Sequence, residues 1–218
     1  MIPFPRLDHG TQGQHLRLVT TNLSGVTRRQ QILDIAAELF AERGFHGVSV
    51  ADLGAACGVS GPALYKHFPS KDAMLADMLV SISEELLSEG RVRVRESTSP
   101  VEALEALIDW HIEFALGHRA LIVVQDRDWA SLPAPARERV RALQRDYVDV
   151  WASQLRRVDL SLRPETARAT AHIAFGLINS TPHSGLLPDD QMRELLRTTA
   201  LRAMGVPTDP RVSLRSES

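Results

Sequence analysis

Three consecutive residues, Tyr65, Lys66 and His67, place three hydrogen-bond donors side by side in a stretch with helical signals. A phenol hydroxyl, an ammonium and an imidazole N–H all suit phosphate oxygens, which accept hydrogen bonds. Ser49 precedes a nearby helical stretch, and helix N-termini attract phosphates through their free N–H groups. Lys71 adds a cation at the start of another helix. The pattern predicts a phosphate-binding surface, with the alternative that Tyr65 is a half-buried core residue.

Short helices must hold these donors in place, and the caps of two such helices are visible in the sequence. Ser49 and Asp52 fit a capping box, in which each side chain accepts from the backbone N–H of the other residue. Ser60 can cap the next helix, with Pro62 in its first turn, where the missing N–H is not needed. The two caps predict two consecutive short helices.

Glycines between these two helices allow them to meet closely. Gly54 and Gly58 lie four residues apart, and Gly58 with Val59 can form a tight turn. This order of elements is typical of a helix-turn-helix. Its second helix has about two turns and is too short to persist alone. It must therefore dock on the rest of the domain, including the helix that begins at Arg28, and this leaves its other face free. Cys57, just before the turn, is expected to be a small buried residue, with a redox sensor as the alternative.

Helical periodicity continues through most of the 218 residues, while a strand pattern does not persist. The sequence predicts an all-α fold with about nine helices. We expect five segments: a mobile N-terminal arm (1–25), a helix-turn-helix domain (26–72), a connecting helix (73–97), a ligand-binding and dimerisation domain (98–205) and a loose tail (206–218).

Composition and missing motifs exclude several protein classes. The net charge of −2 is that of an ordinary soluble protein, and the single cysteine excludes disulfides within the chain and multi-cysteine zinc sites. Nucleophile-elbow, phosphate-loop, dinucleotide and HExxH motifs are absent. We therefore expect no enzyme, no cofactor and no metal site. Without a signal peptide or an apolar run long enough for a bilayer, we expect a cytoplasmic protein with no membrane partner.

The stretch from Arg28 to about Leu79 resembles the DNA-binding domain of the TetR (tetracycline-repressor, TetR/AcrR) family of one-component regulators. The matching segments are ILDIAAELFAERGFHGVSVADLGAACGVS and GPALYKHFPSKDAML, which cover about a quarter of the chain. The resemblance implies that the helix from Ser60 to Phe68 enters the major groove of double-stranded DNA. It assigns phosphate contacts to Ser49, Tyr65, His67 and Lys71, base-edge contacts to Gly61, Pro62, Ala63 and Lys66, and minor-groove or phosphate contacts to Arg28 and Arg29.

The stretch from Ala171 to Ile178 is apolar on nearly every side except at His172, which is typical of a helix buried all round. In a small helical bundle this pattern suggests that a partner subunit covers one side. The family resemblance implies the same, because its last two long helices form a dimer interface. The predicted interface residues of a homodimer are Ala167, Ala171, Ala174, Phe175, Ile178, Leu195 and Leu196.

Polar and aromatic residues interrupt the apolar faces of the C-terminal half. Each residue taken singly is typical of a core or interface position with its hydrogen bonds satisfied. Together, these residues predict a ligand cavity between helices. The segment RALIVVQDRDWASL resembles family members that sense acyl-CoA thioesters, so we expect a large apolar effector with an acidic or thioester end, such as a fatty-acyl-CoA. The predicted ligand-binding residues are Trp110, His111, Gln125, Asp126, Trp129, Trp151, His172 and Asn179.

The function that we expect is a repressor that binds a palindromic operator as a dimer and is released by the effector. We expect ligand to act by tilting the connecting helix, which changes the separation of the two recognition helices. The alternative is a DNA-binding regulator without a small-molecule effector, controlled by a partner protein or by its abundance.

Overall fold

The computed structural model describes residues 27–206. The predicted N-terminal arm and nearly all of the predicted tail lie outside this range. The described chain contains nine α-helices, two short 3-10 turns and no strand, which confirms the all-α prediction. The helices are α1 (Arg28–Arg43), α2 (Val50–Cys57), α3 (Gly61–His67), α4 (Lys71–Glu96), α5 (Pro100–Gly117), α6 (Arg119–Asp128), α7 (Ala134–Val158), α8 (Pro164–Ile178) and α9 (Asp189–Ala203); the turns are η1 (Trp129–Ser131) and η2 (Thr181–His183).

Local capping signals explain where most of these helices begin. The Ser49–Asp52 capping box is present at the start of α2, and the side chains of Ser60, Ser70 and Ser99 accept from backbone N–H groups at the starts of α3, α4 and α5. At the start of α5 the Glu102 carboxylate also accepts from the N–H of Thr98, at 2.7 Å.

Two prolines flank the first residue of α7. The helix begins at Ala134, between Pro133 and Pro135. Pro135 is tolerated there because the first turn of a helix has no intrahelical acceptor for its N–H groups.

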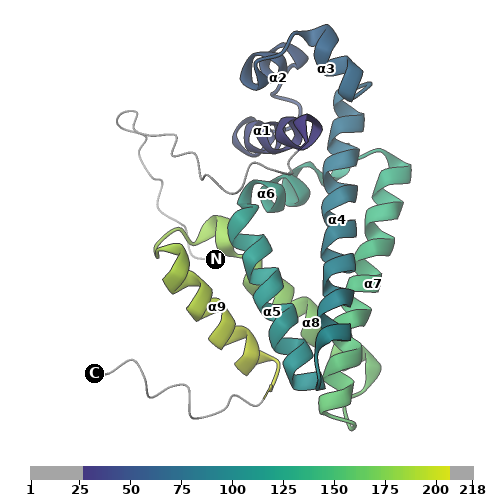
Figure 1. Ribbon diagram of the computed structural model, residues 1–218, viewed down its shortest axis with the longest axis vertical. Coiled ribbons are helices and arrows are strands. Elements are labelled where there is room, and N and C mark those ends of the chain that lie inside the picture. Colours follow the sequence, from purple (N-terminus) through teal and green to yellow (C-terminus); the bar gives the residue numbers. More distant parts are fainter. Residues whose placement is uncertain (1–26, 207–218) are drawn as a thin grey trace, which may run out of the picture.

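The helices form an elongated molecule with α1, α2 and α3 gathered at one end (Figure 1). From there α4 runs along the length of the molecule beside α7, and α5, α8 and α9 complete the opposite part. The short α6 lies between α1 and the rest of the bundle. None of the described helices is long and apolar enough to cross a membrane.

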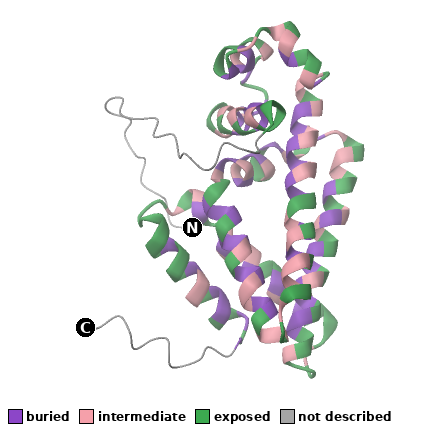
Figure 2. Ribbon diagram, viewed as in Figure 1, coloured by how far each residue is buried: buried purple, intermediate pink, exposed green. Residues whose placement is uncertain are grey.

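Two hydrophobic cores share α4, which explains how the two ends of the molecule are joined. Met74 and Leu79, in the first half of α4, pack with α1, α2 and α3, whereas Ile82 and Leu87 pack with α5, α7, α8 and α9. Figure 2 shows the buried residues continuing along α4 through both parts. Helix α6 also contributes to both cores, with Val124 in the first and Ile122 in the second. The two parts are therefore packed together rather than separated by a linker.

Candidate functional site

The pairing of α2 and α3 has the close approach that the glycine spacing predicts. The Val59 N–H donates to the Gly54 carbonyl at 2.9 Å, and a Cβ on Gly54 would lie only 2.9 Å from the Val59 carbonyl oxygen. Leu53, Leu64 and Phe68 are buried and fasten this pair to α1. The short α3 is thus held by its apolar side chains and by the turn before it.

The remaining face of α3 points outward. Tyr65 is 51% exposed, and Lys66 is exposed beside it. Within residues 27–206, the Tyr65 hydroxyl and the Lys66 ammonium have no hydrogen-bond partner, so both donors are free to meet another molecule. Pro62 is exposed, and Gly61, Ala63 and His67 are partly exposed on the same short helix.

Two of the predicted phosphate ligands are instead engaged inside the protein. The Lys71 ammonium donates to the Phe45 carbonyl at 2.7 Å and to the Val48 carbonyl at 2.8 Å, and it lies 4.3 Å from the centre of the Phe45 ring. The Ser49 N–H and hydroxyl both donate to Asp52, at 2.8 and 2.5 Å. These bonds hold the pKa of the Asp52 carboxyl below its usual value, so a negative charge lies beside Ser49. The Ser49 hydroxyl and two of the three N–H donors of Lys71 are therefore used inside the protein.

The two arginines at the start of α1 are also partly engaged. Arg28 donates to the carbonyl of Cys57 at 2.5 Å and to the side chain of Gln31 at 3.2 Å. Arg29 forms an ion pair with Asp77, and its guanidinium lies 4.5 Å from the centre of the Phe68 ring. Both side chains therefore connect α1 to neighbouring helices, and contact with DNA would require these bonds to be exchanged.

Cys57 is a core residue at the end of α2, which agrees with the prediction of a small buried residue. Its side chain is 5% exposed, and burial raises the pKa of the thiol. A thiol with these properties is unreactive.

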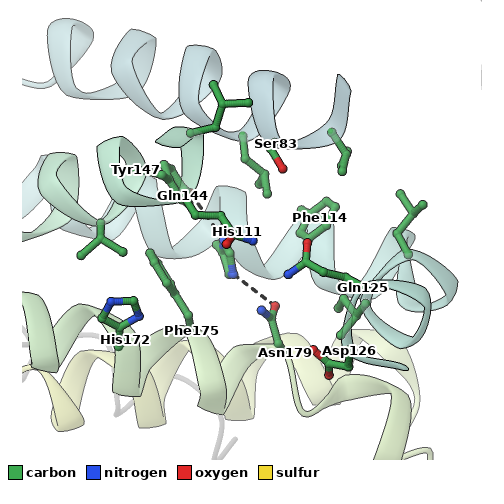
Figure 3. Close-up of a pocket in the computed structure, with 16 residues that line it drawn as sticks. Ser83, His111, Phe114, Gln125, Asp126, Gln144, Tyr147, His172, Phe175 and Asn179 are labelled. Carbon is green, nitrogen blue, oxygen red and sulfur yellow. Dashed lines mark hydrogen bonds between the residues drawn. The ribbon is translucent and has the colours of Figure 1, made fainter. Parts of the chain in front are cut away.

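A cavity of about 250 Å³ lies among α4, α5, α6, α7 and α8 (Figure 3). Five of the predicted ligand-binding residues line it: His111, Gln125, Asp126, His172 and Asn179. They come from α5, α6 and α8 with its C-cap, so the fold brings together residues that are up to 68 positions apart in the sequence, as in the hydrogen bond from His111 to Asn179.

His111 is the centre of the polar contacts in this cavity. Its Nε2 lies 3.2 Å from Asn179 Oδ1, and its Nδ1 lies 3.4 Å from the Tyr147 hydroxyl. Because Oδ1 can only accept, Nε2 carries the proton and Nδ1 accepts from Tyr147. Burial lowers the pKa of His111 to about 4, although the bond to Asn179 acts in the opposite direction. Burial raises the pKa of the Tyr147 hydroxyl, so both groups are neutral at physiological pH.

The three tryptophans do not line the cavity, unlike our expectation. Trp151 is fully buried behind it, with its ring edge-on to that of His111 at 5.9 Å between centres. Trp110 and Trp129 lie under arginine guanidinium groups, 4.3 Å from Arg93 and 5.6 Å from Arg141, respectively. Their size and aromatic character made them candidates, but large rings also serve as core and surface packing.

Sequence reasoning missed several polar and aromatic lining residues. Ser83, Gln144 and Tyr147 face the cavity, and so does Phe175, which we had placed in the dimer interface. Gln144 and Tyr147 are three residues apart on α7, a spacing that puts them on one helix face. That spacing was a usable signal. Gly90 adds to the arrangement, because a Cβ there would lie 2.7 Å from the Tyr147 ring, so its absence lets this ring lie against α4.

Most of the predicted interface residues lie inside the protomer. Ala167, Ala171, Ala174 and Ile178 are 0% exposed, and Leu196 is 5% exposed. They form part of the core against α7 and α9, so they have no surface left for a second chain, and this part of the prediction was wrong. Leu195, which was among the predicted interface residues, is 52% exposed on α9, and Ile173, which was not predicted, is 63% exposed on α8.

Helix α6 joins the cavity directly to α1. Gln125 and Asp126 line the cavity, whereas the next residue, Arg127, donates to two carbonyls at the end of α1. These are the carbonyls of Phe40 and of Ala41, the latter at 2.9 Å. Carbonyls in the last turn of a helix attract cations, so Arg127 caps the end of α1 together with the Gly44 N–H, which also donates to the Phe40 carbonyl.

Two family models match this chain. The model of the bacterial regulatory proteins of the tetR family matches residues 32–78, and that of the tetracyclin repressor-like C-terminal domain matches residues 97–204. The HTH-type transcriptional repressor KstR2 of Rhodococcus jostii is 37% identical over 108 residues, which are 49% of this chain and 52% of the relative. The match thus spans about half the length of this curated relative.

Solved structures show the same fold over more of the chain. A TetR-family transcriptional regulator from Bordetella parapertussis has a TM-score of 0.70 and 28% sequence identity, with 79% of this chain and 93% of the other covered. AibR, solved in complex with isovaleryl coenzyme A and operator DNA, has a TM-score of 0.66 and 24% identity, with 79% and 97% covered.

Proposed function

Because the chain belongs to the tetR family of bacterial regulatory proteins, we propose that it is a transcriptional repressor whose affinity for DNA is controlled by a small molecule bound in the central cavity. Two features together support this function best. Within the described part of the chain, helix α3 faces outward with two unpaired donors, Tyr65 and Lys66. Helix α6 both lines the cavity and contacts α1, against which α3 packs. The relative KstR2 is named as a transcriptional repressor and not as an enzyme, and this name supports a non-catalytic role.

We propose that α3 enters the major groove, with Tyr65 at a phosphate and Lys66 at a base edge. A lysine can donate to the acceptors of guanine, whereas Gly61 and Ala63 offer only backbone and a methyl group. Sequence-dependent DNA shape then supplies part of the specificity. Because Ser49 and Lys71 are engaged inside the protein, we expect few phosphate contacts per protomer and a modest dependence of the affinity on salt.

The DNA-bound form that we propose is a homodimer built on α8 and α9. The exposed Ile173 and Leu195 are the apolar residues that such an interface would cover, and Gly176, which is exposed on α8, would allow close approach. A two-fold dimer presents two copies of α3 and therefore selects a palindromic operator.

We propose that the effector acts through α6 as well as through α4. A molecule in the cavity contacts Gln125 and Asp126, and any shift of that turn moves Arg127, which caps α1. The effector can weaken operator binding only by the factor by which it binds the conformation with a misplaced α3 more tightly than the DNA-binding conformation. An acyl-CoA or related thioester remains the effector class that the sequence favours, and the alternative is a regulator that is controlled by a partner protein or by its abundance.

Operator selection from random DNA duplexes tests the DNA-binding part. We expect one palindromic site to be enriched, with weaker binding by both Tyr65→Phe and Lys66→Ala, and with looser selection at one base for Lys66→Ala. Arg139→Ala, an exposed change on α7, is the control. Enrichment of no sequence would contradict the proposed function.

Ligand titration then separates the two alternatives. Tryptophan fluorescence is a suitable signal because Trp151 packs against His111, which lines the cavity. A molecule that changes the fluorescence and also lowers operator affinity supports ligand control. A protein that selects an operator but whose affinity responds to no cavity ligand would be the regulator without an effector.

A further inference from the structure

We propose that the central cavity selects an uncharged group that both donates and accepts hydrogen bonds, and that it rejects carboxylates and phosphates. This inference rests on the proposed function of the cavity as the effector site. It narrows the effector that the sequence suggested, because an acidic end is excluded from the enclosed part of the ligand.

The first observation is the charge of the side chains that line the cavity. Among residues 27–206, sixteen line it, and neither lysine nor arginine is among these sixteen. Asp126 is the one carboxylate of the lining, and it lies at the exposed edge on α6. An anion that left water for this cavity would lose its hydration, gain no cation in return and be repelled by Asp126.

The histidines do not supply the missing cation at the buried end. His111 is 3% exposed and is held neutral between an acceptor, Asn179 Oδ1, and the hydroxyl of Tyr147. Both ring nitrogens are already in use, so a ligand does not reach either without breaking one of these bonds. His172 is exposed and stands at the rim.

The amides of the lining carry the second part of the argument. Gln125 and Gln144 line the cavity from opposite helices, and within residues 27–206 their side chains form no hydrogen bond to another residue. Asn179 uses its oxygen for His111, which leaves its NH₂ group available. Amides offer donors and acceptors together, so they match a carbonyl, hydroxyl or amide on the ligand.

The volume sets the third condition. About 250 Å³ is just below the roughly 300–1,000 Å³ of cavities that enclose drug-sized ligands. A complete nucleotide-bearing thioester does not fit, but its acyl end and thioester carbonyl do. The enclosed chemistry is the same for a free neutral molecule and for the acyl end of a thioester, so an experiment has to separate these two sources.

Matched ligands on one scaffold that differ in charge and in hydrogen-bond donors and acceptors test the selectivity. We would titrate the full-length protein with the amide, carboxylate and amidine forms of phenyl, cyclohexyl and isobutyl scaffolds, and follow the fluorescence and the melting temperature. We expect binding of amides, with carboxylates on the same scaffold weaker by at least about tenfold. Preferred binding of carboxylates would overturn the inference, and so would preferred binding of amidines or binding of none. Benzoyl-coenzyme A, compared with benzamide, shows whether the thioester source binds more tightly.

A variant that adds the missing cation provides the converse test. Gln144→Lys should bring carboxylate binding to at least the level of the amide, because the lysine would offset the charge of the anion. Gln125→Lys is the second variant if the first does not fold, as judged by circular dichroism. Gln191→Lys, an exposed change on α9, is the control and should leave the preference for amides unchanged. Carboxylate binding that is equally weak in both folded cavity variants would contradict the assignment.

The result is independent of the DNA-binding experiment. A protein that selects an operator but prefers carboxylates would retain the proposed function and lose only this inference. A protein that selects no operator would lose the proposed function, whatever its ligand preference.

Discussion

Acid should destabilise this protein through His111, and the size of the effect can be worked out from its burial. Burial lowers the pKa of His111 from 6.5 to about 4. The unfolded chain therefore binds a proton between these values that the folded chain does not bind, so stability falls as the pH falls from 6.5 towards 4. The difference of about 2.5 pKa units corresponds to about 3 kcal/mol of unfolding free energy, of which about 2 kcal/mol should be lost by pH 5.

Replacing the imidazole isolates this contribution. In His111→Phe the ring stacking on Phe175 is kept, but Tyr147 and Asn179 lose their partner, which should cost about 1–3 kcal/mol at pH 7. At pH 5 the variant has no proton to take up at this position, so its disadvantage should shrink by about 2 kcal/mol. The change in the difference between the two proteins is the quantity to measure, because effects of other titrating groups cancel in it.

The assay is urea unfolding followed by circular dichroism at several pH values between 7 and 5. The protein concentration is held constant, since the stability of an oligomer depends on it. His183→Gln, in the exposed turn η2, is the control. A difference between wild type and His111→Phe that stays constant with pH would refute the assignment of His111 as a neutral buried imidazole.

Four further substitutions have expected outcomes. Gly54→Ala places a methyl group 2.9 Å from the Val59 carbonyl oxygen, so we expect a loss of about 1–3 kcal/mol in thermal or urea unfolding and weaker operator binding. Lys71→Met removes the bonds to two carbonyls and should lower stability by about 1–3 kcal/mol, whereas Lys66→Met should leave stability within about 0.5 kcal/mol and lower operator affinity instead. Arg127→Met removes the cap on α1, and we expect operator binding that responds less to a cavity ligand, measured by the shift in operator affinity at saturating ligand.

Controls keep these outcomes interpretable. Gly117→Ala changes a glycine around which a new Cβ meets nothing within 4 Å, and it should not lower stability as Gly54→Ala does. Arg139→Met removes an exposed arginine that pairs with Glu84, and it should leave the ligand response intact. If Lys66→Met destabilised the protein as much as Lys71→Met, the separation of structural and DNA-facing lysines would be wrong.

Local signals were sufficient for the helices but not for the faces that they present. Serine caps and prolines act within one or two turns, so the starts of α2, α3, α4 and α5 could be predicted from the sequence alone. The orientation of α8 could not, because its apolar residues surround most of the helix. Whether Ala171 or Ile173 faces the core depends on where α7 and α9 lie, and that is decided by long-range packing.

The same limit applies to the donors near α3. Residue type marked Ser49 and Lys71 as phosphate ligands, but the structure gives their donors to Asp52, Phe45 and Val48. The bonds of Lys71 join residues that are 26 and 23 positions apart and are not visible as a sequence pattern, whereas the capping box of Ser49 and Asp52 is. Tyr65 and Lys66 were easier to place, because on a two-turn helix one face must dock and the other is left outside.

The position of Arg127 directly after Gln125 and Asp126 has a consequence for how the protein would behave in a cell. If occupancy of the cavity changes the affinity for an operator by some factor, then occupancy of an operator changes the affinity for the ligand by the same factor. Protein on DNA would therefore require a higher ligand concentration than free protein. The apparent sensitivity of the response would then depend on the number of operators in the genome, and one turn of α6 would set both thresholds.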